Sequence, residues 1–315
     1  MSKRRRMRIS ISRASLAGSL VLTAAGCATG GSASAPTQSP MRDTPSAAVA
    51  GLLAADRGFA AAASETDLIT ALAKMFATDV VMPAPESRLA SGLGEVLRVL
   101  QSNPANERSR MQWTPIRGGV SADAQHGFTY GYFTTIRPDG VRIPGKYLAY
   151  WTRSASGWRV SAYKRVQRAE GQVSVVERAP ALPPRLVVPG DEAARARFGE
   201  ELAETERAFS RDAQTIGLGP AFVRYAAPDA MNLGGPQSAE ILFGPEAIGQ
   251  GVSSSSTAST ITWAPDTVRV ATSGDLGVTI GFITITTAGD GTQRVPFFTV
   301  WRRDDPGQPW RFVAE

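Results

Sequence analysis

The stretch GFTYGYFTTI, residues 127–136, returns as GVTIGFITIT at residues 277–286, 150 positions further along the chain. In both stretches apolar or aromatic side chains alternate with Gly and Thr, which is typical of a β-strand with two different faces. Gly131 and Gly281 fall at the same place inside each stretch. Glycine weakens a flat strand, so its repetition here predicts a bulge or a sharp bend in the sheet.

The duplication extends over most of the chain. A period this long indicates tandem globular domains, because solenoid repeats are roughly 20–50 residues long. We therefore predict two domains, 46–178 and 191–315, each large enough to bury its own core. All six tryptophans form pairs at spacings of 150, 150 and 152 residues: Trp113 with Trp263, Trp151 with Trp301, and Trp158 with Trp310. Other pairs at the offset of 150 are Arg57 with Arg207, Phe59 with Phe209, Asp79 with Asp229, and Gly94 with Gly244.

Each copy begins with helical patterns and ends with strands. Apolar residues at helical spacing predict a first helix, capped by Ser46 in the first copy and by Asp191 in the second. A second helix is predicted to follow Asp67, and to end at Asp79 and Asp229 in the two copies. A third, short helix should begin near Gly94 in the first copy and near Gly244 in the second. This order makes the fold class α+β, with two tandem domains in each of which N-terminal helices pack on the concave face of a bent antiparallel sheet.

The N-terminus carries targeting features. Residues 2–13 hold six basic side chains and no acid, and a short apolar run follows at 14–26. This run is too short for a permanent membrane span and predicts a signal peptide over 1–26. It ends in LTAAGC, residues 22–27, which resembles a bacterial lipobox, so Cys27 is the predicted lipidation site. An ordinary signal peptide that happens to contain a cysteine is the alternative.

The lipobox resemblance implies a lipoprotein of the bacterial cell envelope that faces the periplasm. Ala28 follows the cysteine, which favours the outer membrane over the inner. Residues 27–45 read as a flexible tether, and the Pro-rich residues 179–190 as a linker between the copies. Cys27 is the only cysteine, so no intramolecular disulfide can form.

The net charge does not point to nucleic acid. The formal charge of +6 equals the six basic residues of the signal peptide, so the remainder of the chain is close to neutral. That remainder has no basic stripe with interleaved aromatic residues. We therefore exclude nucleic-acid binding.

A set of motifs in order along the chain resembles one known family. Arg57-x-Phe59, Asp79, Trp113-x-Pro115, Gly127-x-x-x-Gly131 and Gly145-Lys-Tyr147 together resemble the SnoaL-like group of the nuclear transport factor 2-like superfamily, and within it a bacterial subgroup of unknown function. The first copy also ends in Gly157-Trp158, which belongs to the same set, and the second copy lacks both the Gly-Lys-Tyr and this closing Gly-Trp. The resemblance implies a cone with an apolar pocket at one end. It also implies pairing of cones, either of the two domains in one chain or in a homodimer.

No catalytic residue, metal site or cofactor is predicted. The resemblance implies a carboxylate base with a His or Tyr partner, but the chain has one histidine, His126, expected at a strand edge. Asp79 and Asp229 are expected to be structural residues at helix ends, and Arg57 and Arg207 to form ion pairs. Paired cysteines, histidine clusters and Gly-rich phosphate loops are missing from the sequence.

The first copy is the predicted site for a ligand because its strands are more polar and aromatic. The candidate ligand-binding residues are Trp113, Tyr130, Tyr132, Lys146 and Tyr147, where hydroxyls and an ammonium among apolar walls would orient a small molecule. Core packing is the alternative for the tryptophan, and an exposed position is the alternative for Lys146, which faces away from Tyr147. On this hypothesis the second copy serves structure or a partner surface.

The sequence is compatible with three functions. The first is an envelope-anchored lipoprotein that binds a small apolar or amphipathic ligand in its first cone. The second is a structural or interaction module with filled cones. The third is an enzyme of the isomerase or cyclase type, which requires an acid/base pair in a cone with a shifted pKa and is the least favoured by the sequence.

Overall fold

The computed structural model describes residues 44–184, 190–254, 259–287, 289 and 291–315. Arg42–Glu315 form one compact unit that holds both copies. The predicted signal peptide, Cys27 and most of the tether lie outside the described residues.

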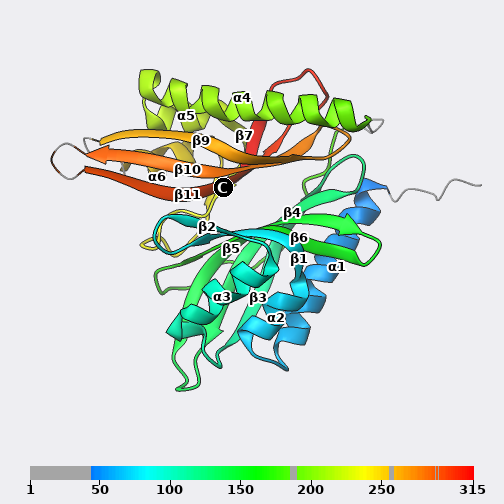
Figure 1. Cartoon of the computed structure of the whole chain (residues 1–315), viewed down its shortest axis with the longest axis vertical. Coiled ribbons are helices and arrows are strands. Elements are labelled where there is room, and N and C mark those ends of the chain that lie inside the picture. The colour runs from blue at the N-terminus through cyan, green and yellow to red at the C-terminus, as the bar shows by residue number, and fades with distance from the viewer. Residues whose placement is uncertain (1–43, 185–189, 255–258, 288, 290) are drawn as a thin grey trace, which may run out of the picture. The chain divides into compact units, whose positions relative to one another are not determined.

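The two copies contain the same helices and strands in the same order, and the first copy has an additional 3-10 turn (Figure 1). The first copy consists of α1 Pro45–Ala63, α2 Leu68–Met75, β1 Phe76–Ala84, β2 Arg88–Ser91, α3 Leu93–Ser102, a 3-10 turn at Pro104–Asn106, β3 Arg110–Val120, β4 His126–Ile136, β5 Arg142–Ser154 and β6 Gly157–Gln167. The second consists of α4 Glu192–Ile216, α5 Leu218–Tyr225, β7 Ala226–Asn232, β8 Leu242–Phe243, α6 Pro245–Ser254, β9 Ser259–Val270, β10 Leu276–Thr287, β11 Gly291–Arg302 and β12 Arg311–Ala314.

Each copy builds one six-stranded sheet, and the two sheets have the same topology. Their strand orders are β2-β1-β6-β5-β4-β3 and β8-β7-β12-β11-β10-β9. Neighbouring strands are antiparallel, except that β1 with β6 and β7 with β12 are parallel pairs, which corrects the prediction of a purely antiparallel sheet. The helices of each copy cover one face of its own sheet (Figure 1). The α+β prediction of two tandem cone domains is confirmed.

Of the two predicted helix caps, Asp191 is confirmed and Ser46 is wrong. Asp191 accepts a hydrogen bond from the backbone N–H of Ala194 at 2.8 Å. Asp67, which directly precedes the second helix, also caps it and accepts from the backbone of Ile69 and Thr70, both at 3.0 Å. In the first copy Thr44, and not Ser46, caps the first helix. The reason is Pro45, which is suited to the first helical position and therefore places the cap one residue earlier.

The second helix of each copy is shorter than predicted. Asp79 and Asp229 do not end it but lie inside strands β1 and β7. Helix α2 ends at Met75 because Phe76 is already extended, with φ −77° and ψ 146°, and pairs with Val160 of β6. Pairing with the rest of the sheet therefore overrides the helical pattern at this point.

The bend predicted at the paired glycines is confirmed. The register between β3 and β4 shifts between Pro115 and Arg117, directly opposite Gly131, and the β9–β10 register shifts beside Gly281. A Cβ on Gly131 would lie 2.0 Å from the carbonyl oxygen of Thr114. Only glycine allows this close approach of two strands.

The structural partner of Gly244 is Gly92, and not Gly94 as the constant offset predicted. Both glycines have φ of 83° and precede a helix. Val81 pairs with Ser91, ten positions later, whereas Met231 pairs with Phe243, twelve positions later. The connection between β7 and β8 is therefore two residues longer than its counterpart, and this longer loop contributes to the site described below.

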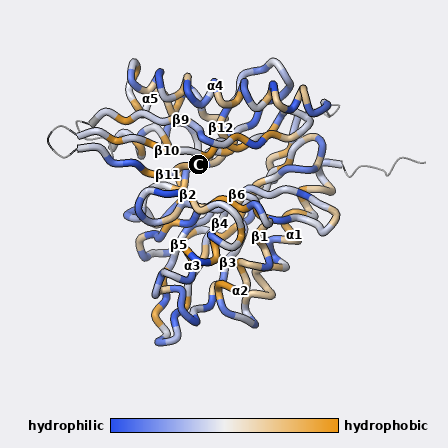
Figure 2. Tube along the Cα trace, viewed as in Figure 1, coloured by the Kyte–Doolittle hydropathy of each residue, from blue (hydrophilic) through white to orange (hydrophobic). Residues whose placement is uncertain are grey.

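Hydrophobic and hydrophilic residues are interspersed along the strands of both sheets (Figure 2). On the helix-covered face of the first sheet, Tyr147 and Trp151 are buried against α1. Residues of the opposite face are also buried in part. Phe128, Tyr130 and Tyr150 of the first copy belong to the same buried cluster as Val278 and Phe298 of the second. The first and second copies therefore share apolar packing between their sheets.

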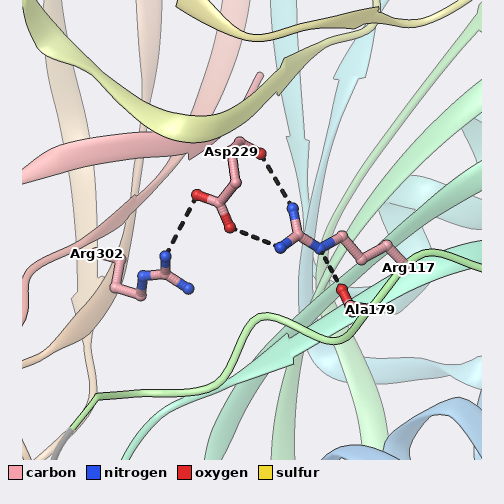
Figure 3. Close-up of polar contacts among 4 residues, drawn as sticks. All are labelled: Arg117, Ala179, Asp229 and Arg302. Carbon is pink, nitrogen blue, oxygen red and sulfur yellow. Dashed lines mark hydrogen bonds and ion pairs between the residues drawn. The ribbon is translucent and has the colours of Figure 1, made fainter.

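Charged contacts join the copies as well. Arg117 donates to the carboxylate of Asp229 at 2.6 Å and to its carbonyl at 3.0 Å, while Arg302 reaches the other carboxylate oxygen at 3.3 Å (Figure 3). In the reciprocal direction Arg269 of the second copy donates to Asp79 at 2.8 Å. Asp79 and Asp229 thus have structural roles, as the sequence indicated, but they act in ion pairs between the copies and not at helix ends.

Candidate functional site

The second copy contains a cavity of about 650 Å³ between its helices and its sheet, and this cavity is partly open to solvent. The walls are mostly apolar, with carboxylate and amide groups among them. Its lining residues are Glu206, Leu218, Phe222, Asn232, Gly234, Gly235, Pro236, Gln237, Ser238, Leu242, Gly251, Val252, Ile261, Trp263, Ile283, Ile285, Phe297 and Glu315. A cavity of this size and character is suited to a small molecule.

Glu206, from helix α4, is the most strongly held polar group of this cavity. Trp263 donates its indole N–H to Oε1 at 2.6 Å, while Trp301 and Thr279 donate to Oε2 at 2.9 and 2.5 Å. The residue is only 1% exposed. Three donors from the sheet therefore fix the carboxyl group of Glu206 against the cavity.

Burial changes the acidity of this group. Desolvation raises the pKa of Glu206 from 4.5 to about 7, against the opposing effect of its hydrogen-bond donors. Glu315, the second carboxyl of the cavity, also has a raised pKa because of burial, and it accepts a hydrogen bond from Asn232 at 3.2 Å. The cavity thus holds two carboxyl groups that are protonated more readily than exposed ones.

The first copy repeats the buried carboxyl group without the cavity. Asp56, at the position equivalent to Glu206, accepts from Trp113 at 2.7 Å and from the hydroxyl of Tyr147 at 2.9 Å. It is fully buried, and desolvation raises its pKa. A hollow of about 180 Å³ lies beside Phe133 in this copy, but Asp56 does not line it.

Three substitutions between the copies account for the difference. Phe133 and Tyr147 of the first copy correspond to Ile283 and Phe297 of the second. Strand β1 pairs Val81 with Ala162, and β7 pairs Met231 with Ala314, so the next residue, Tyr163, corresponds to Glu315. In the first copy the ring of Tyr163 packs against Phe76 at 5.3 Å and Tyr147 at 6.4 Å between centroids. In the second copy Ile283 and Glu315 take the places of two rings, and Phe297 lacks the hydroxyl of Tyr147. These changes remove volume from the second cone and add a carboxyl group.

The structure separates the residues that the sequence grouped as a ligand site in the first copy. Trp113 and Tyr147 lie inside the first cone, in its filled core around Asp56. Tyr130, Tyr132 and Lys146 face the second copy instead. Tyr130 is buried and packs near Phe243 at 6.3 Å, and the hydroxyl of Tyr132 accepts from the backbone of Ile241 at 3.2 Å.

The placement of the cavity in the first copy is therefore corrected. Alternation along a strand divides residues between two faces, but it does not say which face lies inside the cone. Here both faces are buried, one by helices and one by the other copy, so aromatic residues occur on both.

Lys146 makes the most specific contact between the copies. Its ammonium group, with no exposed surface, donates to three carbonyl oxygens of the second copy, those of Ser238 at 2.9 Å, Glu240 at 3.2 Å and Gly235 at 3.3 Å. Burial lowers its pKa to about 8. These carbonyls belong to residues 233–241, which we call the wall loop because its residues 234–238 line the cavity. The first copy thus supports one wall of the second copy's cavity.

Sequence reasoning missed Asp56 and Glu206. The signal for them was present, because both are acidic, both precede the paired Arg57 and Arg207, and both lie on the first helix of their copy at the offset of 150. Because one copy has Asp and the other has Glu at this position, a search for identical residues at the offset of 150 does not find the pair.

His126 lies at the start of β4. Its Nδ1 is 2.9 Å from the hydroxyl of Tyr150, and burial lowers its pKa to about 4.

Over the described part of the chain no helix has the length and apolar character needed to cross a bilayer. Within the same residues no group of three or more potential ligand side chains is placed to hold a metal ion.

Comparisons with known proteins add little about activity. No model of a protein family matches the chain, and no curated protein matches it.

Solved structures do match parts of the chain. A ketosteroid isomerase-like protein from Erwinia carotovora atroseptica is 24% identical, with 39% of this chain and 97% of that one covered and a TM-score of 0.32. A nuclear transport factor 2-like protein of unknown function from Shewanella oneidensis is 11% identical, with 37% and 96% covered and a TM-score of 0.31. One with a cystatin-like fold from Novosphingobium aromaticivorans is 12% identical, with 39% and 82% covered and a TM-score of 0.28. Values this low carry no information about activity.

Proposed function

We propose that this chain binds a small, largely apolar molecule in the cavity of its second copy, while the first copy supports the wall loop. The observation that carries the proposal is the cavity of about 650 Å³, with apolar walls and the fixed carboxyl group of Glu206. Binding pockets of this kind combine mostly hydrophobic lining with a few placed polar groups. The filled first cone supports a structural role for that copy.

Acid–base catalysis is the second candidate function, and Glu206 favours it. A carboxyl group with a pKa raised to about 7 can donate and accept a proton near neutral pH. Glu315, which lines the same cavity, would be the second acid–base group. This arrangement supplies the acid/base pair that an isomerase or cyclase type of enzyme requires, in the second cone.

We also propose that Cys27 carries a lipid that anchors the protein in the bacterial envelope, facing the periplasm and in the outer membrane. The sequence LTAAGC at 22–27, preceded by a basic and then an apolar segment, supports this proposal.

Native mass spectrometry tests the ligand proposal. The full chain, purified gently from the producing cell's own envelope, is expected to carry a non-covalently bound extra mass that is lost on denaturation. Ile283→Phe places in the second cone the ring found at the equivalent position of the first, so it should remove the extra mass. Ile216→Phe, at an exposed position of α4, is the matched control and should retain it.

A bare mass for the unaltered protein would contradict binding, as would an extra mass that survives Ile283→Phe. A retained molecule that is chemically converted during incubation, and is not converted by Glu206→Gln, would decide for the enzyme.

The anchor has its own test. Cys27→Ser is expected to move the protein from the membrane fraction to the soluble fraction, because the thiol is the attachment point for the lipid. Ser32→Ala, in the predicted tether, is the control and should stay with the membranes. Membrane association of both variants would show that the anchor is not at Cys27.

A further inference from the structure

The charged groups that line the second-copy cavity are both acidic. Its described lining residues include the two carboxyl groups of Glu206 and Glu315, but no Lys, Arg or His. One amide N–H of Asn232 is used by Glu315, and its Oδ1 accepts from Gly234 at 2.7 Å. Gln237 and Ser238 add neutral polar groups to the lining. An anionic ligand would therefore meet like charges in this cavity and no cationic side chain among the described lining residues.

Both carboxyl groups have acceptor capacity left for a ligand. A carboxylate offers about four lone-pair directions. Glu206 uses one on Oε1 and two on Oε2 for its three protein donors. Among the described residues, Glu315 uses Oε2 for Asn232, and no donor contacts its Oε1. One position on each group can therefore take a donor from inside the cavity.

The charge of Glu315 is partly balanced from outside the cavity. Lys164 of the first copy favours the ionised form of Glu315 through its positive charge, which opposes the rise of the pKa, but it does not line the cavity. No positive charge is among the causes of the pKa shift of Glu206. The aromatic rings of Phe222, Trp263 and Phe297 also form part of the walls. Ring faces attract cations, so the apolar walls are compatible with a positive ligand group as well.

We propose that the ligand of this cavity is an apolar amine, whose ammonium group donates hydrogen bonds to Glu206 and Glu315. This inference rests on the proposed binding function and specifies the class of ligand. An amine supplies the positive charge that the described lining lacks, and its N–H groups match the free acceptor positions of the two carboxyl groups. Its apolar body occupies the space beside Ile283 and Phe297.

Three probes of one shape test the inference by isothermal titration at pH 7.5: naphthalen-1-ylmethylamine, naphthalen-1-ylmethanol and naphthalene-1-carboxylate. The protein is residues 42–315, which form one compact unit with both cores. We expect the amine to bind about tenfold more tightly than the alcohol, and the carboxylate to bind most weakly.

Two variants test whether the carboxyl groups of Glu206 and Glu315 cause the preference for the amine over the alcohol. In Glu206→Gln/Glu315→Gln the advantage of the amine over the alcohol should fall to less than about twofold, while the affinity for the alcohol stays within about threefold. Glu315→Gln alone should reduce the advantage in part, and serves if the double variant does not fold. Both variants keep the size of the side chains, so a loss of cavity shape would weaken the alcohol equally.

Two results would overturn the inference. One is an alcohol or carboxylate that binds as tightly as the amine, and this leaves the proposed binding of an apolar molecule intact. The other is an amine preference that both variants retain. If none of the three probes binds, the amine inference also fails, and the mass found on the envelope-purified protein still decides the proposed function separately.

Discussion

Replacing Glu206 by Gln is expected to remove about 3 kcal/mol of pH dependence from the free energy of unfolding. Burial raises the pKa of Glu206 from 4.5 to about 7. A carboxyl group with a raised pKa binds its proton more tightly in the folded protein. Its contribution to stability is therefore complete below pH 4.5 and is lost as the pH rises to about 7. Relative to Glu206→Gln, the unaltered protein should lose stability across this window.

Urea unfolding followed by tryptophan fluorescence at pH 4.5, 5.5, 6.5 and 7.5 measures this difference. Asp275, whose pKa is raised to about 6 by burial, and Asp56 contribute equally to both proteins and cancel in the comparison. Glu200→Gln, at an exposed position of the same helix, should show the pH profile of the unaltered protein. Parallel profiles for Glu206→Gln and the unaltered protein would show that Glu206 is not buried as described.

Lys146→Met is expected to lower the free energy of unfolding by about 3 kcal/mol, roughly 1 kcal/mol for each carbonyl that loses its donor. Methionine keeps the length and apolar stem of the side chain, but it has no N–H for Gly235, Ser238 and Glu240. Because these carbonyls belong to the wall loop, amide hydrogen exchange should accelerate there before it does in the strands.

The matched control is Lys74→Met, an exposed lysine of α2, which should change stability by less than about 0.5 kcal/mol. Hydrogen exchange followed by mass spectrometry reports on the wall loop and the strands in one experiment. If Lys146→Met and Lys74→Met were equally stable, water would replace the ammonium group of Lys146 with no loss in the free energy of unfolding.

The repeat made the architecture predictable. Six tryptophans at a nearly constant spacing predicted two copies of one domain, and the strand containing Gly131 predicted the bend that the β3–β4 register shows. Local signals also identified Asp191 as a cap and placed the second helix directly after Asp67. The end of the second helix was not predictable in this way, because Phe76 leaves the helix in order to pair with a strand more than eighty residues away.

The site was harder to predict than the fold. The cavity depends on the sizes of side chains at equivalent positions, and one decisive pair, Tyr163 and Glu315, is separated by 152 residues and not by 150. A constant offset hides that pair. The sequence marks Lys146 as a polar residue among aromatic ones. Its hydrogen-bond partners lie in a loop of the other copy, and no local sequence pattern connects Lys146 with that loop.

The contact between Lys146 and the wall loop has a further consequence, because both ends of it belong to one polypeptide. In a homodimer such a contact would weaken on dilution. A covalent link replaces the bulk protein concentration by an effective concentration in the millimolar range, set only by the linker. The cavity should therefore keep its complete wall at any copy number in the cell, and its ligand affinity should not depend on how much of the protein is made.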